Sequence, residues 1–150
     1  MNLRRLQSRD LDSVLAIQAA SPEIAQWTLW DYRRVAQGQM AGWVAEEAGE
    51  AGEAIGFLIA RQIVTDVEIL NFAVRPDTRR RGVGAALIAE AINWGRAIGA
   101  ERALLEVRAA NLAALQFYER HHFQPTGRRA RYYTSPADDA VMLALGLLPS

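Results

Sequence analysis

The sequence predicts a single-domain α/β fold in which a mixed, mostly antiparallel sheet is flanked by helices. Three observations predict it. Strand-like segments follow one another from Trp43, an amphipathic helical segment spans residues 82–99, and strand and helix patterns alternate from there onward. A chain of 150 residues has the size of one domain, over 1–150, and can bury a core without a disulfide or a metal.

The N-terminal part of the chain predicts one short strand and two helices. Residues 1–7 have the pattern of the strand, and Ser8, which precedes acidic residues, is the expected N-cap of a helix that ends at Ser21-Pro22. Thr28 and Asp31 are spaced as a capping box, in which each side chain accepts a hydrogen bond from the other residue's backbone. A second, short helix is therefore expected from this point.

The middle of the chain predicts neighbouring strands. Residues 43–46 and 54–64 are expected to form two strands around an acidic, glycine-containing hairpin loop at 47–53. Residues 67–74 and 103–107 are almost continuously apolar, which predicts strands that are covered on both faces.

The helix at 82–99 has the clearest pattern, because Val83, Leu87 and Ala91 fall on one apolar stripe. The expected order of elements is β-α-α-β-β-β-α-β-α-β-β. Its last members are a helix over 112–120 and two strands, 124–133 and 140–147, around a Ser135-Pro136 turn.

Composition excludes several kinds of function. The 17 basic and 17 acidic side chains cancel, which argues against nucleic-acid and acidic-membrane partners, because these attract an excess of positive charge. Without Cys there is no disulfide, thiolate metal site or cysteine nucleophile, and the two His, at 121 and 122, make a zinc site unfavourable. The Cys and His content therefore predicts a protein that uses no metal. Because we find no signal segment or membrane span, we expect the protein to be cytoplasmic.

A basic turn with two glycines joins the strand at 67–74 to the helix at 82–99. Arg79–Arg81 stand directly before Gly82 and Gly84. A helix N-terminus presents unpaired N–H groups and a partial positive charge, and glycine lets a ligand approach the backbone closely. An isolated Arg triplet is usually a solvated charge run, but its place between strand and helix suits a pyrophosphate.

Two common nucleotide motifs do not fit this turn. A P-loop needs a Lys, and the chain contains none. The dinucleotide fingerprint needs a third small residue where Leu87 stands.

The pattern Arg79-x-x-Gly82-x-Gly84 resembles the turn with which the GNAT superfamily of N-acetyltransferases binds the pyrophosphate of acetyl-CoA. The resemblance covers residues 67–145 well and the N-terminal part thinly. Within the superfamily, the sequence is similar to one branch in particular, the RimI-type ribosomal-protein-alanine N-acetyltransferases. The segments that carry it are Asn71–Pro76, Leu105–Asn111, Phe117–Glu119, Phe123 and Arg129–Leu143, with Trp27, Thr28 and Tyr32 on the N-terminal side.

Two positions depart from the family pattern. His122 stands where Gly is usual, directly before Phe123, and Gln26 stands where Pro is usual, directly before Trp27. The first bears on the local turn geometry and the second on the shape of the substrate entrance.

The resemblance implies an acetyl-CoA site. The Arg and Gly turn would hold the pyrophosphate, and the backbone at Ala73 and Val74 would pair with the pantetheine arm. Asn111 would bond the same arm and also cap the following helix. The expected binding residues are Ala73, Val74, Arg79, Arg80, Arg81, Gly82, Val83, Gly84 and Asn111.

Two residues are expected to carry the chemistry. The resemblance makes Glu106 the general base, acting through water, and Tyr118 the acid that protonates the departing thiolate. Glu106 can equally lie at the frayed end of its strand or pair with Arg108, and Tyr118 can be an ordinary core aromatic. Glu68 competes as the base, because other superfamily members place theirs on the preceding strand.

Acceptor-side residues are expected in two aromatic segments. Trp27, Tyr132 and Tyr133 would wall the acceptor slot, with Glu68 nearby, although strand aromatics often only pack. The acidic residues Glu46, Glu47, Glu50 and Glu53 can attract a cationic substrate or form a solvated hairpin tip.

The acceptor is expected to be an α-amine. Its pKa is about 7.7–8.0, against about 10.4 for Lys, so one carboxylate can neutralise it more easily. We expect direct transfer of acetyl to a protein N-terminus, best the N-terminal Ala of a ribosomal protein. A small-molecule amine acetyltransferase and a catalytically idle acetyl-CoA-binding module remain as alternatives.

Overall fold

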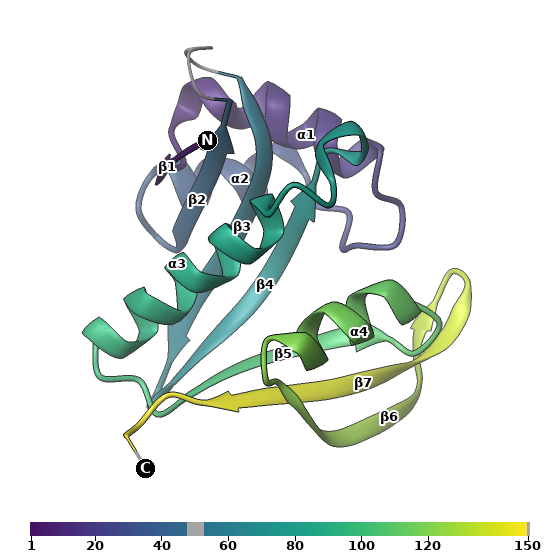
Figure 1. Cartoon of the computed structure of the whole chain (residues 1–150). Coiled ribbons are helices and arrows are strands. Elements are labelled where there is room, and N and C mark those ends of the chain that lie inside the picture. Colours follow the sequence, from purple (N-terminus) through teal and green to yellow (C-terminus); the bar gives the residue numbers. More distant parts are fainter. Residues whose placement is uncertain (48–52, 150) are drawn as a thin grey trace.

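The computed structural model describes residues 1–47 and 53–149. In this part of the chain the sheet has seven strands in the order β1-β2-β3-β4-β5-β7-β6, all antiparallel neighbours except β4 and β5 (Figure 1). The elements are β1 Asn2–Arg5, α1 Leu11–Ala19, α2 Leu29–Ala36, β2 Ala41–Glu46, β3 Ala54–Ile63, β4 Asp66–Val74, α3 Val83–Ala97, β5 Arg102–Arg108, α4 Leu112–Arg120, β6 Gln124–Thr134 and β7 Ala137–Gly146, with short 3-10 turns at Ser8–Asp10 and Pro76–Thr78.

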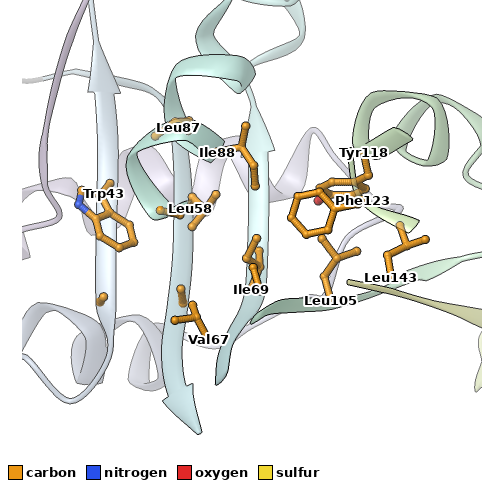
Figure 2. Packing of buried hydrophobic residues seen from close by; sticks show 14 of the residues in the cluster. Trp43, Leu58, Val67, Ile69, Leu87, Ile88, Leu105, Tyr118, Phe123 and Leu143 are labelled. Atoms are coloured by element: carbon orange, nitrogen blue, oxygen red, sulfur yellow. The ribbon is translucent and has the colours of Figure 1, made fainter. Parts of the chain in front are cut away.

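Helices cover both faces of the sheet. α1 and α2 lie behind it in Figure 1, and α3 and α4 lie in front. The α1 and α2 side buries an apolar cluster around Val14, Tyr32 and Phe57. The other side buries a larger cluster, which includes Leu58 and Leu87 and is shown in Figure 2. None of the described helices is long and apolar enough to cross a membrane.

The predicted order of helices and strands is confirmed, as are the helix at 112–120 and the turn at Ser135-Pro136. The capping box of α2 is also confirmed. The Thr28 hydroxyl accepts from the Asp31 N–H, and the Asp31 carboxylate accepts from the Thr28 N–H at 2.8 Å.

The prediction that Ser8 caps the first helix is wrong. α1 begins at Leu11, and Ser8 opens a 3-10 turn in front of it. Asp10 organises this turn, because its carboxylate accepts from the Gln7 N–H and from both terminal nitrogens of Arg4, each at 2.8 Å. Asp10 is fully buried, so its interaction with Arg4 outcompetes a local serine cap.

The prediction that two strands are covered on both faces is confirmed for β4 and wrong for β5. β4 lies in the centre of the sheet, with Val67 and Ile69 in the cluster on the α3 side and Ala73 in the cluster on the α1–α2 side. In β5 only every second residue is buried, and Glu106 is exposed on the other face. Leu104, an apolar residue on that less covered face of β5, made this strand look covered on both faces.

A bulge at Leu70 changes which residues of β4 face which helices. Ile59 of β3 pairs with Asn71 and Ala60 pairs with Ile69, so Leu70 is an extra residue. One extra residue inverts the alternation of a strand. Ile69 therefore packs on the α3 side, whereas Asn71, two positions later, bonds to the α1–α2 side.

β4 and β5 pair only at their beginnings. The parallel register joins Asp66–Glu68 to Arg102–Leu104, whereas the two strands continue to Val74 and Arg108. Figure 1 shows them diverging from this common start. The edge of β4 that faces β5 therefore offers backbone N–H and C=O groups that β5 does not take up.

We expect Asp10→Ala to lower the free energy of unfolding by about 3 kcal/mol, because it leaves Arg4 without the acceptor of two of its bonds. Chemical denaturation at neutral pH measures this. Asp12→Ala, in the exposed first turn of α1, is the control and should cost less than about 0.5 kcal/mol. Equal effects of the two substitutions would contradict the assigned role of Asp10.

Candidate active site

The basic turn after β4 leads directly into the N-terminus of α3. Arg80 and Gly82 both adopt positive φ, at 65° and 82°, and Gly82 is the N-cap of α3. Gly82 has no side chain with which to cap this helix end. The first N–H groups of an α-helix have no partner within the helix, so those of α3 are free to receive an anion.

The arginines of the turn have different surroundings. The Arg79 guanidinium donates to the Val74 carbonyl and to the Ser21 hydroxyl, both at 3.2 Å. The Arg81 guanidinium donates to both carboxylate oxygens of Glu47, at 2.7 and 3.1 Å. Arg79 therefore ties the turn to the segment after α1, whereas Arg81 reaches the end of β2.

The described acidic residues near the hairpin loop are paired with arginines. Glu46 accepts from Arg4 at 3.0 Å, Glu47 from Arg81, and Glu53 lies 3.7 Å from Arg75. Glu50, the remaining member of the predicted acidic group, lies outside the described residues. Two groups that are separate in the sequence thus meet in the fold, and the charge at the turn is partly neutralised from within the chain.

α4 packs beside the first turn of α3. Asn111 caps α4, because its side-chain oxygen accepts from the Ala114 N–H at 3.2 Å, which confirms the predicted cap. A Cβ on Gly84 would lie 3.4 Å from ring atoms of both Phe72 and Phe117. Gly84 thus lets the first turn of α3 approach Phe72 of β4 and Phe117 of α4.

Tyr118 on α4 combines a buried ring with an open hydroxyl. Its ring packs against Phe123 (Figure 2), and the centroid of the Phe72 ring of β4 lies 6.4 Å from that of Tyr118. The hydroxyl has no hydrogen bond to the described residues, and it is not one of their fully buried polar atoms, so the oxygen keeps some exposure to solvent. Burial of the side chain raises the pKa of Tyr118 above its usual value. The phenol therefore remains protonated and can donate.

Glu106 and Glu68 lie on the sheet face opposite Tyr118. Glu106 is not at a frayed end, because it pairs with Met142 in the middle of the β5–β7 ladder. Its carboxylate lies 3.8 Å from Arg129 of β6, not against Arg108. Glu68 lies within the short paired section of β4 and β5, and its carboxylate is 3.2 Å from Arg61.

The hairpin of β6 and β7 brings aromatic side chains to Glu106. Burial and the charge of Glu106 both raise the pKa of Tyr133, and the Arg108 guanidinium stacks on the Tyr133 ring at 4.3 Å. Tyr132 is exposed and lies beside the Arg129 guanidinium. The structure therefore brings Tyr133 near the predicted base, whereas Tyr132 lies beside Arg129, the ion-pair partner of Glu106.

Trp27 belongs to the segment between α1 and α2 and packs against Tyr32, with ring centroids 5.3 Å apart. Gln18, Tyr32 and Asn71 form a buried polar cluster behind it, which sequence reasoning missed. One signal was present in the sequence, because Asn71 is a lone polar residue inside the apolar run of β4. The described residues contain no group of three or more metal-ligating side chains.

Comparison with known proteins places this arrangement in a family. The model of the acetyltransferase (GNAT) family matches residues 3–123. The chain belongs to the GNAT family of acetyltransferases. It is 31% identical over 118 residues to the ribosomal protein bS18-alanine N-acetyltransferase of Escherichia coli, an alignment that covers 77% of this chain and 80% of that protein.

Solved structures show the same GNAT fold. A ribosomal-protein-alanine N-acetyltransferase from Escherichia coli superimposes with a TM-score of 0.85 at 26% identity, covering 99% of this chain and 95% of the other. Arabidopsis thaliana NAA60 in complex with acetyl-CoA gives a TM-score of 0.85 at 21% identity, covering 97% and 98% of the two chains. The second likeness concerns the fold alone.

The local structure accommodates both departures from the usual GNAT pattern. His122 adopts a positive φ of 70°, a left-handed conformation that glycine adopts without steric cost. Its N–H donates to the Glu119 carbonyl at 3.0 Å, which closes the turn after α4. Gln26 folds back on its own segment, where its side-chain amide donates to the carbonyls of Ser21 and Ile24 at 3.3 and 3.1 Å.

We expect His122→Gly to change the free energy of unfolding by less than about 1 kcal/mol, because relief of the left-handed backbone offsets the greater freedom of glycine in the unfolded chain. His122→Val should lower it by about 1–2 kcal/mol, since β-branched residues fit this conformation worst. Thermal unfolding of both variants measures the difference. A valine variant as stable as the wild type would contradict the assignment.

Proposed function

We propose that the chain transfers the acetyl group of acetyl-CoA to the α-amino group of a protein N-terminus, with the N-terminal alanine of a ribosomal protein as the best candidate. The observation that carries the proposal is the free edge of β4, which runs into the basic turn with Tyr118 on one sheet face and Glu106 on the other. The acceptor is suggested by the Escherichia coli relative.

The proposed acetyl-CoA site follows the diverging strands. The free N–H groups at Gly82, Val83 and Gly84, with the arginines of the turn, would receive the pyrophosphate. The backbone of Ala73 and Val74 would pair with the pantetheine arm, because β5 leaves this edge of β4 open. The side-chain amide nitrogen of Asn111, whose oxygen caps α4, would donate to the same arm.

The proposed reaction is a direct transfer. The neutral amine attacks the thioester carbonyl carbon, a C–N bond forms, and the C–S bond breaks. The proton released by the amine passes through water to Glu106 and then to solvent. The thiolate of CoA leaves with a hydrogen bond from the Tyr118 hydroxyl and takes up one proton, so the products are the N-acetylated acceptor and CoA.

The raised pKa of Tyr118 defines its role more closely. A phenol with a pKa above about 10 is a weaker acid than a thiol with a pKa of about 8.5, so complete proton transfer to the thiolate is uphill. The phenol remains a hydrogen-bond donor over the whole range of an ordinary assay. We therefore assign to Tyr118 the stabilisation of the developing thiolate, with the final proton replaced from solvent.

Glu106 is the better candidate for the base than Glu68. Glu68 lies where β4 and β5 still pair, and Arg61 holds its carboxylate. Glu106 lies beyond the last paired residue, Leu104, where an acceptor on one sheet face can meet a thioester held between the strands. Its contact with Arg129, at 3.8 Å, is longer than that of Glu68 with Arg61, at 3.2 Å.

The surroundings of Glu106 support a peptide acceptor. Trp27 on one side and Tyr132 and Tyr133 on the other would form the walls of the slot. Neutralising an α-amine at pH 7 costs about 1 kcal/mol, against about 5 kcal/mol for Lys. A ribosomal protein would meet the enzyme in the cytoplasm.

Transfer from acetyl-CoA to a peptide that begins with Ala, followed by release of free thiol, tests this function. Polyamines and aminoglycosides in the same assay test a small-molecule acceptor. Binding of acetyl-CoA without any turnover would overturn the proposal in favour of a binding module.

We expect Glu106→Gln to lower kcat by about 100-fold or more, the typical contribution of a general base, and to leave acetyl-CoA affinity nearly unchanged. Glu68→Gln is the matched control, since it removes one carboxylate from the same sheet face. Steady-state kinetics and acetyl-CoA titration measure both. Loss of activity in the Glu68 variant with an active Glu106 variant would reverse the assignment.

We expect Tyr118→Phe to lower kcat about 100-fold to 1,000-fold, because one donor to the developing charge is lost. Its stability should stay near that of the wild type, since the hydroxyl bonds no described residue. The loss should be the same from pH 6 to pH 9, because burial keeps the phenol protonated there. A loss that disappears at low pH would show that the role is not that of a constant donor.

A further inference from the structure

We propose that the buried cluster of Gln18, Tyr32 and Asn71 positions the acceptor wall relative to the strand that holds acetyl-CoA. These are positioning residues, because they act through Trp27 and the backbone around it. The proposal rests on the proposed function, in which Trp27 faces the acceptor and β4 holds the thioester.

The cluster is a continuous chain of hydrogen bonds from β4 to the segment between α1 and α2. The Asn71 amide donates to the Ala25 carbonyl at 3.0 Å and to the Tyr32 hydroxyl at 2.9 Å. The Tyr32 hydroxyl donates to the Gln18 side-chain oxygen. Gln18 then holds Trp27 twice, accepting from its N–H at 3.0 Å and donating to its carbonyl at 2.9 Å.

Because the chain of hydrogen bonds is buried, it fixes the position of the segment between α1 and α2 relative to β4. Gln18, Tyr32 and Asn71 are 6%, 0% and 4% exposed. Water does not replace a broken bond at such a site, so each loss leaves an unpaired polar group. The segment is therefore held at one distance from β4.

The other support of this segment is local or apolar. No helix or strand lies between Ala19 and Leu29 in the described structure. Its other hydrogen bonds join residues 16–26 to one another, Arg79 contacts Ser21 and Glu23, and Ile24 and Trp27 pack against the apolar cluster of α1 and α2. The buried cluster supplies the hydrogen bonds that connect residues 25–27 to β4.

The position of Asn71 links the two substrates. The bulge at Leu70 turns the Asn71 side chain toward α1 and α2, and Ala73 follows two residues later on the same strand. The strand that would bind the pantetheine arm and the segment that would wall the acceptor thus share one rigid connection. Loosening it should weaken acceptor binding and leave acetyl-CoA binding intact.

Tyr32→Phe is the sharpest test, because it removes one hydroxyl and keeps the ring packed against Trp27 and Phe57. We expect the amides of residues 24–28 to exchange with deuterium roughly threefold to tenfold faster relative to those of α3. KM for the acceptor peptide should rise by a similar factor, while kcat and the KM for acetyl-CoA stay within about twofold. Gln18→Leu should produce the same pattern.

Val35→Ala is the matched control. Val35 lies on α2 in the same apolar cluster as Tyr32 and is 4% exposed, so its truncation destabilises the protein without breaking the bonds to Trp27. It should speed exchange without selectivity for residues 24–28 and leave the acceptor KM unchanged.

The proposal would be overturned if the amides of residues 24–28 exchange in Tyr32→Phe as slowly as in the wild type. It would also be overturned if exchange speeds up equally in α3. An unchanged acceptor KM in a variant with selectively faster exchange would overturn it as well. Absence of turnover in the wild-type protein refutes the proposed function instead, and the exchange data still decide whether the cluster holds the segment.

Discussion

The inserted residue at Leu70 is the constraint on which the rest of the site depends. Before it, the buried residues of β4 face α3, and after it, Asn71 and Ala73 face α1 and α2. The same stretch of strand lies beyond its last pairing with β5. One strand therefore contributes an unpaired backbone edge, a polar anchor for the segment between α1 and α2 and, through Phe72, contact with the aromatic side chains of α4.

Much of this fold was predictable because its signals are local. The Thr28 and Asp31 capping box, the Asn111 cap and the turn at Gly82 each depend on a few neighbouring residues, and the structure contains all three. Helix α3 was equally clear, since its apolar stripe repeats over four turns. The order of elements follows from these signals together.

The parts that could not be predicted from the sequence depend on contacts between different elements. Asp10, not Ser8, directly precedes the first helix, and its carboxylate is held by Arg4 of β1. Neither the Arg129 partner of Glu106 nor the extra residue at Leu70 has a signature in local spacing, because each depends on strand register. The acidic and basic groups that cancel in the total charge also proved to be neighbours, which composition does not reveal.

The short parallel pairing between β4 and β5 also bears on how the acceptor specificity of such an enzyme can evolve. Only three residue pairs join the two strands, while the β6–β7 hairpin that carries Tyr132 and Tyr133 reaches the rest of the sheet through β7 alone. Changes in this hairpin would alter one side of the proposed acceptor slot without touching the strand and turn proposed for acetyl-CoA. With the proposed function, the part that binds acetyl-CoA can thus stay constant while the hairpin changes to fit new amines.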